Sequence, residues 1–146
     1  MKKFIPKNPS FKRVIADVLT RQFFMKHVRI TLVYCEPAHV LLKLDIEEIH
    51  LQQAFALHGG VIATIADIAM GFSALTLAPA GKGMVTSNLN LSFIRKGVGK
   101  TLWAKAKVIK EGNLLTYCKA SIYTTDELDT KTVIAKSTAT MCSIAL

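Results

Sequence analysis

The stretch over residues 61–80 constrains the fold more than any other part of this sequence. Its side chains are apolar or small except for Asp67, so a helix built from them would be apolar almost all the way round. A membrane span is disfavoured, because an acidic side chain at its centre costs about 2.5–3.5 kcal/mol. No second span accompanies it, and we expect no transmembrane segment. The sequence therefore predicts a helix over residues 60–77, enclosed by the rest of a single domain, residues 1–146.

Segments with a two-residue period surround this helix and predict an antiparallel sheet. Apolar residues alternate over 28–35 and over 40–46, and Glu36-Pro37-Ala38 lies between them, which is typical of a hairpin. Four longer strands are expected after the helix: one around Val85, Leu89, Leu91 and Phe93, which share a parity, one over residues 102–108, and two near 114–124 and 132–143. A sheet that curls round the helix would bury it, so the expected fold class is α+β.

A second helix is expected near residues 10–26. Phe11, Ile15 and Val18 recur at helical spacing after Ser10, a residue type that caps helices. Residues 1–30 carry eight basic residues and one acidic residue. The sequence does not assign this helix a role.

Basic residues outnumber acidic ones by 19 to 10, and the formal net charge of +9 indicates an anionic partner or surface. Between residues 82 and 119 the only acid is Glu111. This basic stripe suits the phosphates of a ligand, a nucleic acid or an anionic lipid, but a solvated strand face has the same composition, and both interpretations stay open. Few aromatic residues lie among the cations, so we expect no nucleic-acid partner.

Cys35, Cys118 and Cys142 form no CxxC pair and leave an odd thiol, which is typical of reduced cysteines in a reducing compartment. The N-terminus lacks the apolar run of a signal peptide, and we expect a cytoplasmic protein. A hydrophobic content of 51% excludes a disordered chain. No metal-binding motif is present, and we expect no metal.

Asp67 is the candidate for chemistry, because it is the only ionisable residue between His58 and Lys82. A carboxylate on an apolar helix is costly unless it is paired, hydrogen-bonded or close to a cleft. It is either a catalytic group or a structural one that reaches solvent or backbone at a subunit interface.

Gly59 and Gly60 begin the same helix, where free backbone N–H groups can polarise a carbonyl oxygen. Gly60 and Asp67 are seven residues apart, which is about 10 Å along a helix and too far for both to reach one carbonyl carbon. We therefore expect Asp67 to act with the Gly60 amide of another chain, in an obligate dimer with shared sites. The alternative is that the two features are unrelated.

The segment His58-Gly59-Gly60 followed after six residues by Asp67 resembles the HGG-x6-D signature of hotdog-fold acyl-CoA thioesterases of the phenylacetate-degradation type. The later segment from Asn90 to Gly97 is similar to another stretch of that family. The resemblance covers residues 28–143 and implies a hotdog fold that forms homodimers and often homotetramers. It also implies that Asp67 is the general base or nucleophile, that the Gly60 amide polarises the thioester carbonyl across the dimer interface, and that His58 shapes this oxyanion site or simply stabilises the loop.

Two further site residues depart from the family pattern. Gln52 stands where many members have Asn, and Thr86 where many have Ser, although both keep a hydrogen-bonding group. Thr86 has the opposite parity to Leu89 and Leu91, which leaves its orientation open.

Coenzyme A, as part of the substrate and not as a cofactor, is the implied partner of the basic stripe. The candidates for phosphate contacts are Arg95, Lys96, Lys107 and Lys110. The acyl chain is expected near Met70, Phe72 and Met84, unless these residues are ordinary core.

The leading hypothesis is thus a hydrolase that cleaves acyl-CoA thioesters by water attack. The alternatives are a hotdog hydratase or dehydratase, a non-catalytic hotdog protein that binds acyl-CoA or acyl carrier protein, and a charge-driven binder of nucleic acid or anionic membranes.

Overall fold

The computed structural model describes residues 3–146 as one sheet with helices on one side of it. The elements in chain order are α1 (Phe11–Arg21), α2 (Phe23–Val28), β1 (Thr31–Glu36), β2 (His39–Asp45), the short 3-10 helix η1 (Glu48–His50), α3 (Gly59–Leu75), β3 (Lys82–Phe93), β4 (Thr101–Glu111), β5 (Leu115–Thr125) and β6 (Lys131–Ala145). None of the helices described has the length and apolar character that crossing a bilayer requires.

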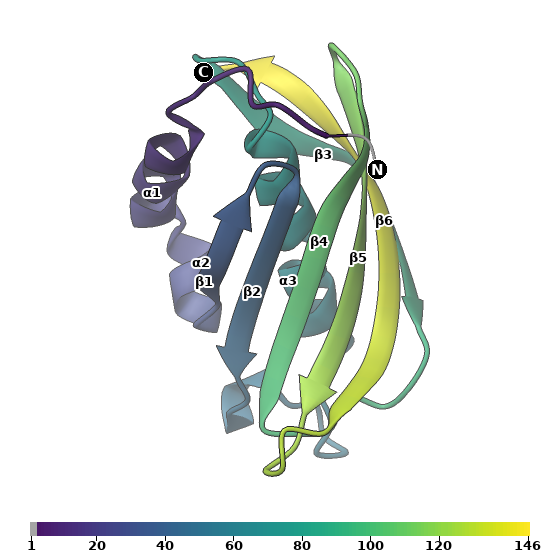
Figure 1. Cartoon of the computed structure of the whole chain (residues 1–146). Coiled ribbons are helices and arrows are strands. Elements are labelled where there is room, and N and C mark those ends of the chain that lie inside the picture. The colour runs from purple at the N-terminus through teal and green to yellow at the C-terminus, as the bar shows by residue number, and fades with distance from the viewer. Residues whose placement is uncertain (1–2) are drawn as a thin grey trace.

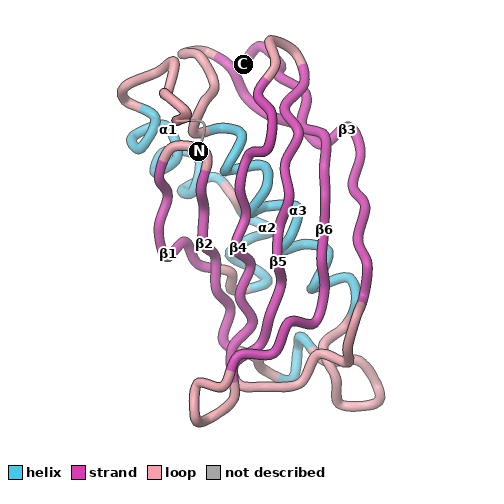
Figure 2. The backbone as a smooth tube through the Cα atoms, turned by 45° about the vertical axis from the view of Figure 1, so that its right-hand side comes forward, coloured by secondary structure: helices cyan, strands magenta, loops and turns pink. Residues whose placement is uncertain are grey.

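All neighbouring strands are antiparallel, in the order β1-β2-β4-β5-β6-β3, so β1 and β3 form the two edges. The sheet curls around α3 (Figure 1), and α1 and α2 lie on the same side of the sheet as α3 (Figures 1 and 2). This arrangement confirms the expected α+β hotdog fold: an antiparallel sheet around a long apolar helix, with further helix at the N-terminus.

The core lies between α3 and the inner face of the sheet. Ile65, Ala69 and Met70 of α3 are fully buried there. The facing strand positions are often alanine, such as Ala104 and Ala106 of β4, and these small side chains allow the helix to pack close to the sheet. Burial of this many apolar side chains is the main force that holds the fold together.

The N-terminal helix predicted over residues 10–26 is instead two helices, and the prediction of one continuous helix was wrong. The backbone leaves the helical conformation at Gln22, with ψ at 72°. After the break, Met25 is buried in the core, where it is only 3% exposed, and α2 continues to Val28. The strand expected from residue 28 therefore begins at Thr31, after α2 has ended.

Strand β3 contains a bulge that decides the orientation of Thr86, which the sequence left open. Its register against β6 shifts between Thr86 and Asn88, so Thr86 lies opposite Met141 and Leu89 lies opposite Ala139, both buried. Directly opposed residues project to the same face. Thr86 and Leu89 therefore both face α3, although their parity differs, and Val85 faces the other way, because the extra residue reverses the alternation.

Candidate active site

One stripe of α3 is not covered by the sheet. Gly60, Thr64, Asp67, Ile68 and Gly71 recur at the spacing of a single helical face, and each is at least partly exposed. The opposite face of the helix is buried. The helix thus keeps its single carboxylate out of the core and presents it beside a cavity.

The Asp67 carboxylate is held by a side chain from β3. The Thr86 hydroxyl donates a hydrogen bond of 2.6 Å to Asp67 Oδ1, and it also lies 3.5 Å from Met141 Sδ. The second carboxylate oxygen has no hydrogen-bond partner within residues 3–146. This geometry orients the carboxylate and leaves one oxygen able to accept a proton.

A cavity of about 420 Å³ adjoins Asp67 and Thr86 and follows α3 toward its C-terminus. Apolar or small residues make up most of its wall, which includes Ile68, Gly71, Phe72, Leu75, Met84 and Met141. Of the three residues expected around an acyl chain, Phe72 and Met84 line this cavity, whereas Met70 is sealed in the core.

Val18, Gln22 and Gly71 are among the residues of this cavity wall that had no assigned role in the sequence. Val18 of α1 and Gln22, which follows α1, close one side of the cavity, so the N-terminal helix contributes to the site. No local pattern could have predicted this contact, because it depends on how α1 docks. Gly71 could have been found, since it lies four residues after Asp67 and therefore on the same helical face.

His58 caps the N-terminus of α3 and thereby occupies part of the expected oxyanion site. Its Nδ1 accepts a hydrogen bond of 2.9 Å from the Gly60 N–H. The amide that was expected to polarise a carbonyl is therefore engaged by His58 in this structure. Because Nδ1 is the acceptor, the neutral ring carries its proton on Nε2, which has no partner within the described chain.

A second cavity, of about 490 Å³, lies at this helix N-terminus and brings together four residues: Gln52, Gly59, Arg95 and Lys96. The Gln52 Oε1 accepts a hydrogen bond from the Ala54 N–H at 2.9 Å, which leaves its amide NH₂ group available. Arg95 is anchored by a 2.8 Å hydrogen bond to the Val133 carbonyl. Asp67 lines the first cavity and not this one, which agrees with its separation of two helical turns from Gly60.

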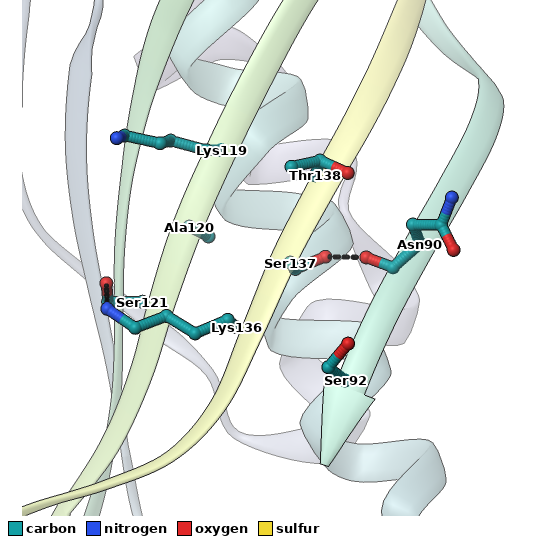
Figure 3. Close-up of a pocket in the computed structure, with 8 residues that line it drawn as sticks. All are labelled: Asn90, Ser92, Lys119, Ala120, Ser121, Lys136, Ser137 and Thr138. Carbon is teal, nitrogen blue, oxygen red and sulfur yellow. Dashed lines mark hydrogen bonds between the residues drawn. The ribbon is translucent and has the colours of Figure 1, made fainter. Parts of the chain in front are cut away.

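The other two residues expected to contact phosphates, Lys107 and Lys110, lie outside this cavity. Lys107 of β4 is directly opposite His39 and Lys119, and it lines a hollow on the outer face of the sheet. Figure 3 shows the adjoining hollow, of about 530 Å³, where Lys136 donates a hydrogen bond of 2.7 Å to the Ser121 hydroxyl. Lys110 lines none of these cavities. The four cations expected to bind phosphates thus form two separate groups.

The described residues contain no cluster of three or more His, Cys, Asp or Glu side chains that could hold a metal ion. Of the three thiols, Cys118 is buried on the inner face of β5, and its removal from solvent raises its pKa to about 11. This group is therefore a packed side chain and not a reactive one.

The sequence matches the model of the Thioesterase superfamily over residues 56–131, just over half of the chain. It is 29% identical to human acyl-coenzyme A thioesterase 13 over 115 residues, which are 77% of this chain and 81% of the relative. It is also 29% identical to the medium/long-chain acyl-CoA thioesterase YigI of Salmonella typhimurium, over 86% of this chain and 97% of that protein.

Solved structures agree in fold. A thioesterase family protein from Silicibacter pomeroyi superposes with a TM-score of 0.90 at 25% identity, covering 93% of this chain and 99% of that one. The PaaI protein of the E. coli phenylacetic acid degradation operon superposes with a TM-score of 0.82 at 18% identity, covering 93% and 94%.

The cap at the start of α3 can be tested by substitution. We expect His58→Ala to lower the free energy of unfolding by about 0.5–2 kcal/mol, because the Gly60 N–H loses its side-chain acceptor. His58→Asn should retain most of the stability, since Asn is a strong N-cap residue. Urea denaturation at matched protein concentration measures both. Equal destabilisation by the two variants would show that His58 does not act through the cap.

Proposed function

Since this chain belongs to the Thioesterase superfamily, we propose that it is a thioester hydrolase that cleaves acyl-CoA by water attack. The single observation that carries this proposal is the 2.6 Å hydrogen bond that holds the Asp67 carboxylate at the wall of an apolar cavity. The relatives named as acyl-CoA thioesterases support the substrate class. Coenzyme A enters only as part of the substrate.

Asp67 is the general base in this proposal. Thr86 fixes one carboxylate oxygen, and the other accepts a proton from a water molecule as the water oxygen bonds to the thioester carbon. The C–S bond then breaks, and the proton passes from Asp67 to the leaving thiolate. The products are a carboxylic acid and the free thiol of CoA.

The Gly60 amide is the proposed donor to the carbonyl oxygen, where negative charge develops. The site around it is crowded, because a Cβ at Gly60 would lie 3.0 Å from His58 Nδ1. When the thioester binds, the amide hydrogen is shared between His58 and the carbonyl oxygen. His58 Nε2–H and the Gly59 N–H, which has no partner among residues 3–146, lie on the same turn and reinforce this donor group.

Two copies of the chain complete the site in this proposal, and β3 is the proposed contact. It is a 12-residue edge strand, and Val85, Leu89 and Phe93 expose apolar surface along it. A long edge strand of this kind is a template for pairing with another chain. Because α3 contacts β3, pairing of the two edges brings the two α3 helices close together, with Asp67 of one copy near Gly60 of the other. A homotetramer would add a further contact between such dimers.

Arg95 and Lys96 are the better supported contacts for the CoA phosphates. They share a cavity with Gln52 and Gly59, next to the proposed carbonyl site, where the Gln52 amide can orient the water or the carbonyl. Lys107 and Lys110 lie on a different part of the sheet, and the hollow that Lys107 lines shares no residue with this cavity. The proposal therefore assigns phosphate binding to Arg95 and Lys96 first.

We expect Asp67→Asn to reduce the release of free thiol from acyl-CoA at least about a hundredfold, because the amide cannot accept a proton. Thr86→Val should reduce the release of free thiol about tenfold, because the carboxylate loses its hydrogen bond. Thr86→Ser keeps the hydroxyl and should retain most of the wild-type activity. Circular dichroism confirms that each variant is folded. Full activity in Asp67→Asn would remove Asp67 from the mechanism, and tight CoA binding without hydrolysis by the wild type would favour the non-catalytic binding protein.

The shared site can be tested by mixing two inactive variants. Gly60→Pro removes the proposed donor N–H in the first helical turn. Because a Cβ at Gly60 would lie 3.0 Å from His58 Nδ1, circular dichroism must first show that this variant is folded. If the site is shared, a refolded equimolar mixture of Asp67→Asn and Gly60→Pro should recover about a quarter of wild-type activity, because mixed dimers keep one intact site. No recovery in mixtures that native mass spectrometry shows to contain mixed dimers would place both residues in one chain's site.

Gly71 should set the length of acyl chain that the cavity accepts. A Cβ at this position meets nothing within 4 Å, so a larger side chain can extend into the cavity without a clash. We expect Gly71→Leu to lower kcat/KM for palmitoyl-CoA at least about tenfold while butyryl-CoA hydrolysis stays near wild type, since a filled cavity excludes only the longer chain. Gly71→Ala is the matched control and should change neither. Equal losses on both substrates would show that the cavity does not hold the acyl chain.

A further inference from the structure

Two consecutive phenylalanines stand exposed at the start of α2. Phe23 is 75% exposed and Phe24 is 60% exposed, whereas the next residue, Met25, is buried in the core. Met25 thus fixes how α2 is turned, and this rotation keeps both rings at the surface. A neighbouring pair of aromatic side chains differs from the isolated apolar residues that are normal on protein surfaces.

Cations and no acids flank the two rings along the chain. Residues 20–30 contain Arg21, Lys26 and Arg29 together with His27, and no Asp or Glu. Arg29 is paired with Glu47, but Arg21 and Lys26 have no carboxylate partner among the residues that the structure describes. Lys26 Nζ lies 5.7 Å from the centre of the Phe23 ring. We call Arg21, Phe23, Phe24 and Lys26 the α2 patch.

We propose that the α2 patch binds the surface of an anionic lipid bilayer. Aromatic rings beside cations match the bilayer interface, where the rings enter the boundary of the acyl chains and the cations meet the lipid phosphates. The binding is peripheral and reversible, because only two rings and a few charges contribute.

A second copy of this chain fits the patch less well. Symmetric contact would bring Arg21 and Lys26 of one copy against the same cations of the other. The patch covers only the end of α1 and part of the six-residue helix α2, whereas a specific protein interface buries about 800 Å² on each partner. An anionic lipid surface supplies the opposite charge and needs no shape complementarity.

The position of the patch links it to the cavity beside Asp67. Gln22 immediately precedes Phe23 and lines that cavity together with Val18. Binding through α2 therefore holds this wall of the cavity close to the lipid surface, where long-chain acyl-CoA, itself an amphiphile, collects. This consequence rests on the proposed function, but the lipid binding does not.

Flotation of the full chain with vesicles tests the proposal. We expect binding to phosphatidylcholine vesicles that contain roughly one third phosphatidylglycerol, and much weaker binding to pure phosphatidylcholine or at high salt. The double variant Phe23→Ser with Phe24→Ser, and the double variant Arg21→Gln with Lys26→Gln, should each lose at least about tenfold in affinity. The matched control is Leu128→Ser, because Leu128 is 87% exposed but lies beside Asp126, Glu127 and Asp129.

Three outcomes would overturn the proposal. They are no binding to either kind of vesicle, equal binding by the wild type and the double phenylalanine variant, and a lower native mass of that variant, which would make the patch an interface between copies. Hydrolysis of butyryl-CoA, measured without vesicles, should be the same in the wild type and both α2 variants. Failure of that activity in all proteins would contradict the proposed function and leave the vesicle result independent of it.

Discussion

A helix that is apolar around most of its circumference is stable in water only if other elements enclose it, and a carboxylate on it must still find a polar partner. In this protein the sheet encloses α3 on all but one stripe, and that stripe carries Asp67. Thr86 then supplies a donor to the carboxylate from the edge strand. The cavity beside Asp67 and the exposed start of the helix follow from the same arrangement, because both lie along the uncovered stripe.

The parts of this structure that depend on local periodicity could be predicted from the sequence. The central helix was expected over residues 60–77 and is found over Gly59–Leu75. The turn near residues 111–113 and the polar turn before Lys131 separate the last three strands as their composition indicates. Asp67 and Gly60 also lie on one face of α3, two turns apart, which follows from helical geometry alone.

Features that depend on tertiary contacts could not be predicted in this way. The break at Gln22 leaves no signal in the helical spacing, because Met25 continues the face of Phe11 and Val18. The hydrogen bond from the Gly60 amide to His58 uses a side chain whose rotamer no pattern specifies. Lys107 belongs to the same basic stripe in the sequence as Arg95, but the fold of the sheet carries it to a different region.

The bulge in β3 gives the two halves of this strand opposite phases. Before Ser87 the even-numbered Thr86 faces α3, and after it the odd-numbered Leu89 and Leu91 do. If the same residues paired without the bulge, either the hydroxyl or the two leucines would turn outward. Deleting Ser87, by contrast, removes the extra residue, so Thr86 and Leu89 become neighbours on one face and both still point to α3. A single-residue gap at this point in an alignment therefore keeps a hydroxyl within reach of the acid on the helix, because it removes the bulge and its change of phase together.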